Sequence, residues 1–227
     1  MVWRWLLFVW IAVFIVLAFT WAPLVPVLGP TTRVLYFHIP AAWVTVLALG
    51  VSMVQSVLYL RTRKLEHDDH AAAAAEIGLL FCITAAVSGA MWAKAMWGAY
   101  WNWDPRETSI FFIMLIYAAY LALRAAVDDP ARRARLSAVY SAIAFVAVPF
   151  LIFIVPRIYF TLHPDPLINT RGKVDMDPRI RWVFLAMLLG VTGVYAWVQQ
   201  LRVRVVRLER RLHQNEWSSG PAPGRTS

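Results

Sequence analysis

Two histidines lie in segments that are rich in aromatic residues and nearly free of charge. His38 stands in Tyr-Phe-His-Ile-Pro-Ala-Ala-Trp at 36–43, and His163 stands in Tyr-Phe-Thr-Leu-His-Pro at 159–164. A neutral imidazole binds transition metals, and apolar surroundings favour the neutral form. Both are candidate metal ligands, although either one alone is more often an incidental residue at a membrane interface. The other histidines, His67, His70 and His213, lie among charged residues that indicate solvated surface.

The densest aromatic segment covers residues 92–108, Trp-Ala-Lys-Ala-Met-Trp-Gly-Ala-Tyr-Trp-Asn-Trp-Asp-Pro-Arg-Glu-Thr. Four of the 12 tryptophans fall between positions 92 and 103. Indole rings crowded on one segment can form a flat, polarizable platform for a large planar ligand. The alternative is an interfacial aromatic belt, although a belt usually scatters its rings over several helix ends. Composition alone leaves both interpretations open.

The end of this segment also has the pattern of a helix start. Asp104 is placed as an N-cap, Pro105 as the first helical residue and Glu107 as the third, which together form a capping-box pattern. Capping alone is enough to explain these residues. It is compatible with ligand binding, because the cap fixes how the aromatic segment leaves the helix.

Together, the two histidines and the aromatic segment suggest two imidazoles that close on the iron of a planar macrocycle. Haem iron accepts histidine nitrogen as an axial ligand, and pocket aromatics exclude water from the ring. Four cations near these segments are candidates for pairing with haem propionates, with plain loop solvation as the alternative: Lys94, Arg106, Arg157 and Arg171. The residues do not choose among the four.

The composition indicates that a membrane bundle positions these residues. The chain has 227 residues, of which 60% are hydrophobic and 15% charged, and its mean hydropathy is +0.58. Soluble domains carry about 25% charged residues, so a soluble enzyme, a disordered chain and a free nucleic-acid binder are disfavoured. Six runs without Asp, Glu, Lys or Arg match the length of membrane-crossing helices, at 5–32, 34–60, 77–93, 108–123, 136–156 and 182–201. We predict an all-α polytopic membrane protein with six transmembrane helices and a tryptophan-rich outer loop between helices 3 and 4.

The distribution of basic residues predicts the orientation. One set of loops and termini holds 14 of the 22 Lys and Arg residues in short segments beside helix ends. The positive-inside rule places this set, with both termini, in the cytoplasm. The loops 22–37, 94–107 and 157–180 then face outward, and the net charge of +9 reflects topology rather than nucleic-acid binding. We expect a membrane domain over 1–201, a basic amphipathic helix over 202–217 and a disordered tail over 218–227.

Two further features limit the function. The single cysteine, Cys82, lies in an apolar run, which indicates a buried structural residue and disfavours thiol redox chemistry. A solute transporter usually carries an ionisable residue or a broken helix at mid-membrane. Here the six runs lack charges, and Pro149 is the one clear breaker within them. A membrane enzyme with Asp104 or Glu107 as a base is the remaining alternative, and two carboxylates with a capping explanation support it weakly.

The segment from Trp97 to Thr108 resembles the WWD signature of the haem-handling proteins of cytochrome c biogenesis. The segments 38–43 and 161–163 look like the two histidine segments of one branch, heme exporter protein C of cytochrome c maturation (CcmC), and the resemblance runs from about Arg33 to Arg202. The tetrapeptide Pro-Arg-Glu-Thr at 105–108 leans toward the CcsA/ResC synthetase branch. That branch is longer and adds an intramembrane histidine pair, whereas in this chain no histidine is predicted inside a span, since His38 is placed at the outer mouth of the second one.

The resemblance implies a protein that is not an enzyme and that holds non-covalent haem b on the periplasmic face of the inner membrane. His38 and His163 would be the axial ligands. The other binding residues that it implies are Trp97, Gly98, Tyr100, Trp101, Trp103, Asp104 and Arg106. The partners would be the haem chaperone CcmE, the ABC-transporter subunits CcmA and CcmB and the single-span subunit CcmD. The chain has no phosphate-binding Gly-x-x-x-x-Gly-Lys-Ser/Thr loop, so ATP hydrolysis would belong to a partner.

Overall fold

The structure is a computed structural model that describes residues 2–163 and 176–219, with side chains up to residue 212. The described part consists of helices and the segments that connect them. Its elements are α1 (Val2–Thr20), the 3₁₀-helix η1 (Gly29–Val34), α2 (Leu35–Thr62), α3 (Leu65–Trp97), α4 (Pro105–Ala125), α5 (Pro130–Pro149), the π-helix η2 (Phe150–Ile154), α6 (Val155–Ile158) and α7 (Pro178–Ser219). Six helical stretches are long and apolar enough to cross a membrane, which confirms the predicted fold class.

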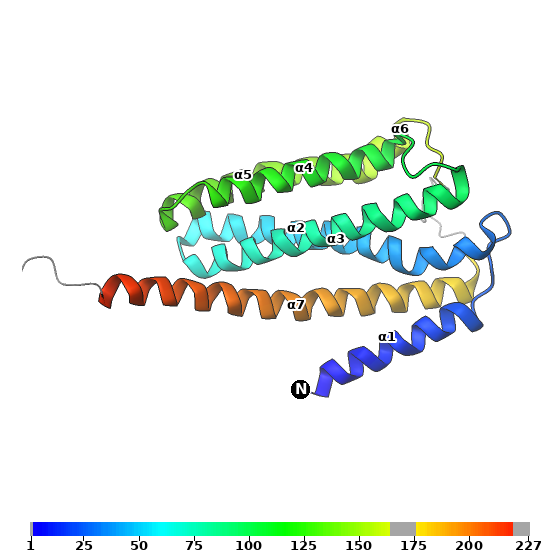
Figure 1. Ribbon diagram of the computed structural model, residues 1–227, viewed down its shortest axis with the longest axis horizontal. Helices are drawn as coiled ribbons and strands as arrows, with labels where there is room; N and C mark the ends of the chain where they lie inside the picture. The colour runs from blue at the N-terminus through cyan, green and yellow to red at the C-terminus, as the bar shows by residue number, and fades with distance from the viewer. Residues whose placement is uncertain (1, 164–175, 220–227) are drawn as a thin grey trace, which may run out of the picture.

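The long helices pack around a central pair, and those that follow one another in the chain run antiparallel (Figure 1). α2 and α3 form this pair, α4 and α5 pack on one side of it, and α7 packs on the other side with α1 against it. Small residues allow the central pair to approach closely, including the run from Ala71 to Ala75, which is fully or almost fully buried. A Cβ atom on Gly78 would lie only 2.6 Å from Leu49 Cδ2. Cys82 is buried in the same core, as the sequence predicts.

The two ends of the bundle differ in what they contain (Figure 1). One end, called here the loop end, contains η1, the connection 98–104 between α3 and α4, and the segment 159–163 after α6. The other, called the turn end, contains the short connections 63–64 and 126–129. The C-terminal part of α7 continues past the turn end without a break between the predicted membrane helix and the basic segment 202–217. Residues 220–227, most of the expected tail, lie outside the described residues.

Several predicted boundaries are corrected by the structure. α2 begins at Leu35, one residue inside the predicted run 34–60, so His38 lies in its first turn and Pro40 lies inside the helix. Proline has no backbone N–H, so Pro40 removes one intrahelical hydrogen bond. It is tolerated because it lies close to the first turn, where the N–H groups have no intrahelical partner. α3 begins at Leu65, well before the run 77–93, and Pro149 is followed by the π-helical turn η2, where the fifth span is irregular.

Ion pairs explain why α3 extends so far into the turn end. Arg124 at the end of α4 forms a two-pronged bond with Asp68, at 2.7 and 3.0 Å. Asp69 is bonded by Arg210 of α7 at 2.9 Å, and Arg202 of α7 pairs with Glu76. Charges that end a hydrophobic run in the sequence are therefore compensated by residues from other helices.

Candidate functional site

The connection between α3 and α4 is fixed at both ends by local backbone structure. Gly98 follows α3 with a left-handed φ of +81°, and its N–H bonds the Lys94 carbonyl. Such a C-cap favours glycine because a side chain is strained at positive φ. Trp103 also has positive φ, +57°, directly before the helix start. The predicted capping box is confirmed: Asp104 accepts from the Arg106 N–H, and Glu107 accepts from the Asp104 N–H.

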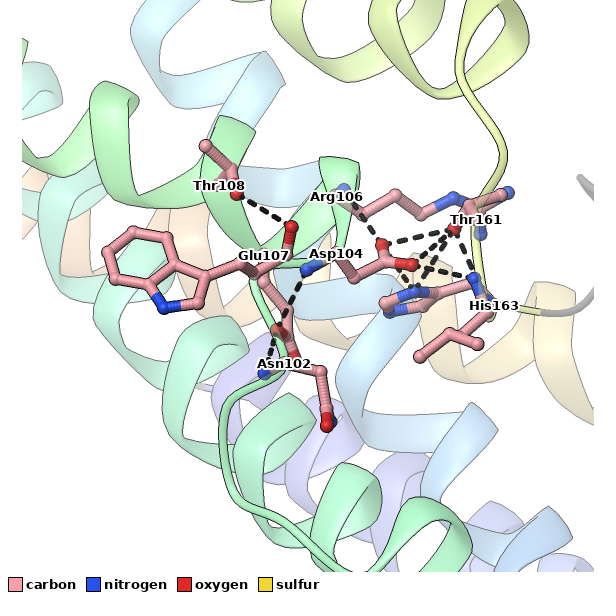
Figure 2. A network of polar contacts seen from close by, with 9 residues as sticks. Asn102, Asp104, Arg106, Glu107, Thr108, Thr161 and His163 are labelled. Atoms are coloured by element: carbon pink, nitrogen blue, oxygen red, sulfur yellow. Dashed lines mark hydrogen bonds and ion pairs between the residues drawn. The ribbon is translucent and has the colours of Figure 1, made fainter.

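Asp104 also binds the segment that carries His163 (Figure 2). Its Oδ2 accepts the Leu162 N–H at 2.7 Å, and Thr161 Oγ1 lies 2.8 Å from the same oxygen. His163 Nδ1 lies 2.9 Å from Oδ1. The Asp104 side chain is fully shielded from solvent. Burial alone would raise its pKa, but the hydrogen bonds from Arg106, Leu162 and Thr161 lower it below the usual range, so this carboxyl is ionised.

The imidazole of His163 is neutral in this setting. Burial lowers its pKa to about 4, although the Asp104 charge opposes that shift, and the positive charge of Arg106 lowers it further. The contact with Asp104 is therefore a hydrogen bond from a neutral ring, with Nδ1–H as donor. The ring packs against two indoles, with centroid distances of 5.0 Å to Trp97 and 5.9 Å to Trp92.

His38 is held in a similar way by α3. Its Nδ1 lies 3.1 Å from Ser88 Oγ. The Ser88 hydroxyl proton is directed to backbone carbonyls, Thr84 O at 2.7 Å or Ala85 O at 3.1 Å, so Ser88 Oγ accepts from His38 Nδ1–H. Gly89 makes room for the ring, because a Cβ atom there would lie 2.9 Å from His38 Cε1.

Both histidines thus use Nδ1–H as a donor, which leaves the lone pair on Nε2. Among the hydrogen bonds of the described residues, neither Nε2 has a partner. A metal-binding histidine typically donates its other ring N–H to a fixed acceptor in this manner. Within the described residues, no group of three His, Cys, Asp or Glu side chains could hold a metal ion. Two imidazoles suit a metal that brings its other ligands with it, as haem iron does.

The tryptophan rings do not form the single flat platform that the sequence suggests. Trp92 and Trp97 meet edge to face at 78°, and Trp101 and Trp103 do so at 89°. Trp97 contacts His163, whereas Trp103 is 70% exposed and Tyr100 is 60% exposed. The rings therefore form a cluster around His163 and a separate pair, in which the half-buried Trp101 contacts the exposed Trp103. Edge-to-face contacts are a preferred arrangement of aromatic pairs, which explains the geometry.

The four candidate cations differ in their surroundings. The Arg106 side chain extends from α4 toward the Thr161–His163 segment (Figure 2). Lys94 is exposed, donates to the Gly98 carbonyl and lies 5.6 Å from the Tyr100 ring centroid. Arg157 is exposed and donates to the Phe153 carbonyl. Arg171 lies outside the described residues. Arg106 is the cation whose charge acts on His163.

Three residues that support the histidines were not identified from the sequence: Ser88, Gly89 and Thr161. Their partners are far away in the chain, since His38 and Ser88 are 50 residues apart and Thr161 and Asp104 are 57 residues apart. One signal for Ser88 exists, because Thr84, Ser88 and Trp92 recur every four residues and so share one face of α3. The sequence contains no comparable signal for Thr161.

The fold and the site define a multi-pass membrane protein that presents two histidines at one end of a helical bundle, one of them a neutral imidazole packed against indole rings. The chain belongs to the heme exporter protein C (CcmC) family, whose family model matches residues 1–218. Membership makes it a membrane component of haem handling for cytochrome c maturation, in a family of haem exporters rather than of known enzymes.

Curated relatives agree with this assignment. Heme exporter protein C of Bradyrhizobium diazoefficiens is 33% identical over 184 residues, which cover 81% of this chain and 70% of the relative. The Escherichia coli K12 protein of the same name is 30% identical over 186 residues, covering 81% of this chain and 74% of the relative. A putative cytochrome c biosynthesis ccmC-like mitochondrial protein of Marchantia polymorpha is 32% identical over 169 residues, covering 74% and 71%.

Proposed function

We propose that this protein binds haem b non-covalently on the outer face of the inner membrane and delivers it to the haem chaperone CcmE. In this proposal it works in a complex with the ABC-transporter subunits CcmA and CcmB and the small subunit CcmD. Family membership and six membrane-spanning helices support the proposal. ATP hydrolysis is assigned to a partner, because the sequence has no phosphate-binding loop.

The observation that carries the proposal is the matched state of His38 and His163. Each ring has its Nδ1–H engaged, by Ser88 Oγ and by the Asp104 carboxylate, and each leaves Nε2 available. Bound haem would supply an iron whose two axial positions accept such nitrogens. Trp92 and Trp97 would shield the His163 side from water, and Arg106 would offer a positive charge to a propionate.

The absorption spectrum of the purified, haem-loaded protein tests the ligand assignment. Wild type should show a low-spin spectrum, and His38→Ala or His163→Ala should each shift it toward a high-spin form because one axial ligand is lost. Added imidazole should partly restore the original spectrum by entering the vacant position. His67→Ala is a matched control, since its ring is also bonded through Nδ1, to Gln55 at 2.8 Å, but lies at the turn end. An unchanged low-spin spectrum in the double mutant His38→Ala/His163→Ala would contradict the assignment.

A transfer assay tests the delivery step. Haem-loaded wild type mixed with membrane-anchored CcmE should pass haem to it, and both histidine variants should transfer less, whereas His67→Ala should behave like wild type. A protein that binds no haem but moves a solute across liposomes would instead support the transporter alternative.

Reporter fusions test the orientation. Fusions after residues 65 and 130, at the turn end, should report the cytoplasm, and a fusion near residue 100 should report the outer side. A cytoplasmic result at residue 100 would place the histidines on the face opposite to a periplasmic chaperone, and the delivery model would then be wrong.

A further inference from the structure

The Asp104 carboxylate holds two elements together at the loop end. It is the N-cap of α4 through the Arg106 N–H, at 2.9 Å from Oδ1, and it binds the 161–163 segment through three donors (Figure 2). A helix cap needs only one of these bonds. The side chain is 0% exposed, although most N-cap carboxylates can remain partly solvated. Its burial and its three additional donors call for a role beyond capping.

The chemistry of a carboxylate determines the state of the ring beside it. An ionised carboxylate can only accept hydrogen bonds, so His163 must carry its proton on Nδ1 to make the 2.9 Å contact. The lone pair is then on Nε2, the nitrogen on the far side of the ring. The edge-to-face contact with Trp97, at 69° between the ring planes, restricts rotation that would exchange the two nitrogens.

We propose that Asp104 is a positioning residue that fixes the Nδ1–H tautomer of His163 and strengthens its Nε2 as a donor to haem iron. This inference rests on the proposed function. A carboxylate partner gives the imidazole partial imidazolate character, which raises the basicity of the coordinating nitrogen. His38 has a neutral hydroxyl partner instead, Ser88, so the two axial ligands are inequivalent and His163 is the stronger donor.

The variant Asp104→Asn separates capping from positioning. Asparagine caps helices about as well as aspartate, so α4 should still start at the same place. The variant loses the negative charge and turns one acceptor atom into a donor. We expect it to insert in the membrane and to bind haem about 10–100-fold more weakly, the usual cost of losing such an outer partner. The midpoint potential of the remaining bound haem should become more positive, because a weaker donor stabilises ferric iron less.

Glu107→Gln is the matched control. It changes the other arm of the same capping box, where Glu107 accepts the Asn102 N–H at 2.8 Å, and no described bond joins it to His163. Its haem affinity and midpoint potential should equal those of wild type. If Asp104→Asn does not fold, Asp104→Ser serves as a second variant, because serine also caps a helix but cannot reproduce the charge.

A double-mutant cycle distinguishes positioning from a general structural role. If Asp104 acts through His163, Asp104→Asn should change neither potential nor affinity further in a His163→Ala background. Additive effects would overturn the inference, as would a wild-type potential in Asp104→Asn. The two proposals fail separately: an unchanged spectrum in His163→Ala would overturn the ligand assignment itself. A shifted spectrum in His163→Ala with wild-type behaviour in Asp104→Asn would overturn only the role of Asp104.

Discussion

At the turn end, charged side chains from α3, α4 and α7 pair with one another, whereas at the loop end the neutral imidazole of His163 contacts indole rings and the buried carboxylate of Asp104. Asp68 and Asp69 are bonded by Arg124 and Arg210. Asp104 has a histidine partner that is neutral, with a pKa of about 4. A guanidinium remains charged at all relevant pH values and so forms a permanent connection between helices. A neutral imidazole keeps a lone pair for a ligand, so the turn end holds the bundle together and the loop end can bind.

The largest effect is expected on the free energy of unfolding, from a substitution that changes the turn end alone. In Asp68→Ala, Arg124 would keep its charge with its side chain only 13% exposed and its main partner removed. The loss of one member of a buried pair costs about 3–5 kcal/mol, so the free energy of unfolding in detergent should fall by that amount. The haem spectrum of the folded fraction should keep its wild-type position, because the histidines lie at the other end.

Asp129→Ala is the control for this prediction. Asp129 is an exposed N-cap of α5 at the same end, bonded to the Arg132 N–H. Its removal should cost only about 1 kcal/mol. Equal losses in the two variants would mean that the buried pair contributes no more than an ordinary cap.

The features that the sequence predicted are those that depend on neighbouring residues. Six long charge-free runs are sufficient for six spans, and the capping box at Asp104 is complete within four residues. The alternation of loops between the two ends then places His38, the tryptophan segment and His163 at one end. Only the order of the elements was needed for this step.

The features that the sequence missed depend on distant residues. The early start of α3 could not be predicted because the charges of Asp68 and Asp69 are balanced from α4 and α7, 56 and 141 residues away. The partners of His38 and His163 are similarly remote. Ring orientation also depends on packing between segments, so the sequence left a flat platform and an aromatic belt both open and could not predict the edge-to-face contacts.

The second prediction compares two tryptophans of the loop end, Trp97, which contacts His163, and Trp103, which is exposed. Trp97→Ala removes edge-to-face contacts with both Trp92 and His163, each worth about 0.5–1.5 kcal/mol, so haem should bind about 5–150-fold more weakly. Trp103→Ala removes an exposed ring whose described ring contact is with Trp101, so the loss should be about 2–10-fold. Titration of the purified variants with haem measures both.

Trp182→Ala is the control for exposed rings. Trp182 lies on α7 and is 64% exposed, close to the 70% of Trp103. Its loss should leave haem affinity unchanged. Equal effects at all three positions would show that the tryptophans serve only folding and membrane anchoring.

The third prediction concerns Ser88, the hydrogen-bond partner of His38. Ser88→Ala removes the acceptor of His38 Nδ1–H, a neutral hydrogen bond worth about 0.5–1.5 kcal/mol, so haem affinity should fall about 2–10-fold. This is less than the effect expected for the charged partner of His163. Thr84→Val, one turn earlier on α3, removes a hydroxyl that bonds only the Leu80 carbonyl among the described contacts and should have no effect. A larger loss in Ser88→Ala than in Asp104→Asn would reverse the proposed order of the two ligands.

The smallest expected effect is that of acidification on His163. An exposed imidazole with a pKa of about 6.5 would be about 90% neutral at pH 7.5 and about 10% neutral at pH 5.5. Burial lowers the pKa of His163 to about 4, so this ring stays neutral across that range. Because the pKa is lower in the folded chain than in the unfolded one, the stability from burying the neutral ring is complete above about pH 6.5 and declines as the pH falls.

The test uses His38→Ala, in which His163 is the remaining ligand. Because the His163 ring stays neutral, haem binding to this variant should change by less than about 1.2-fold between pH 7.5 and pH 5.5. A tenfold loss with a midpoint near pH 6.5 would show that His163 titrates as an exposed residue and that the loop end does not shield it.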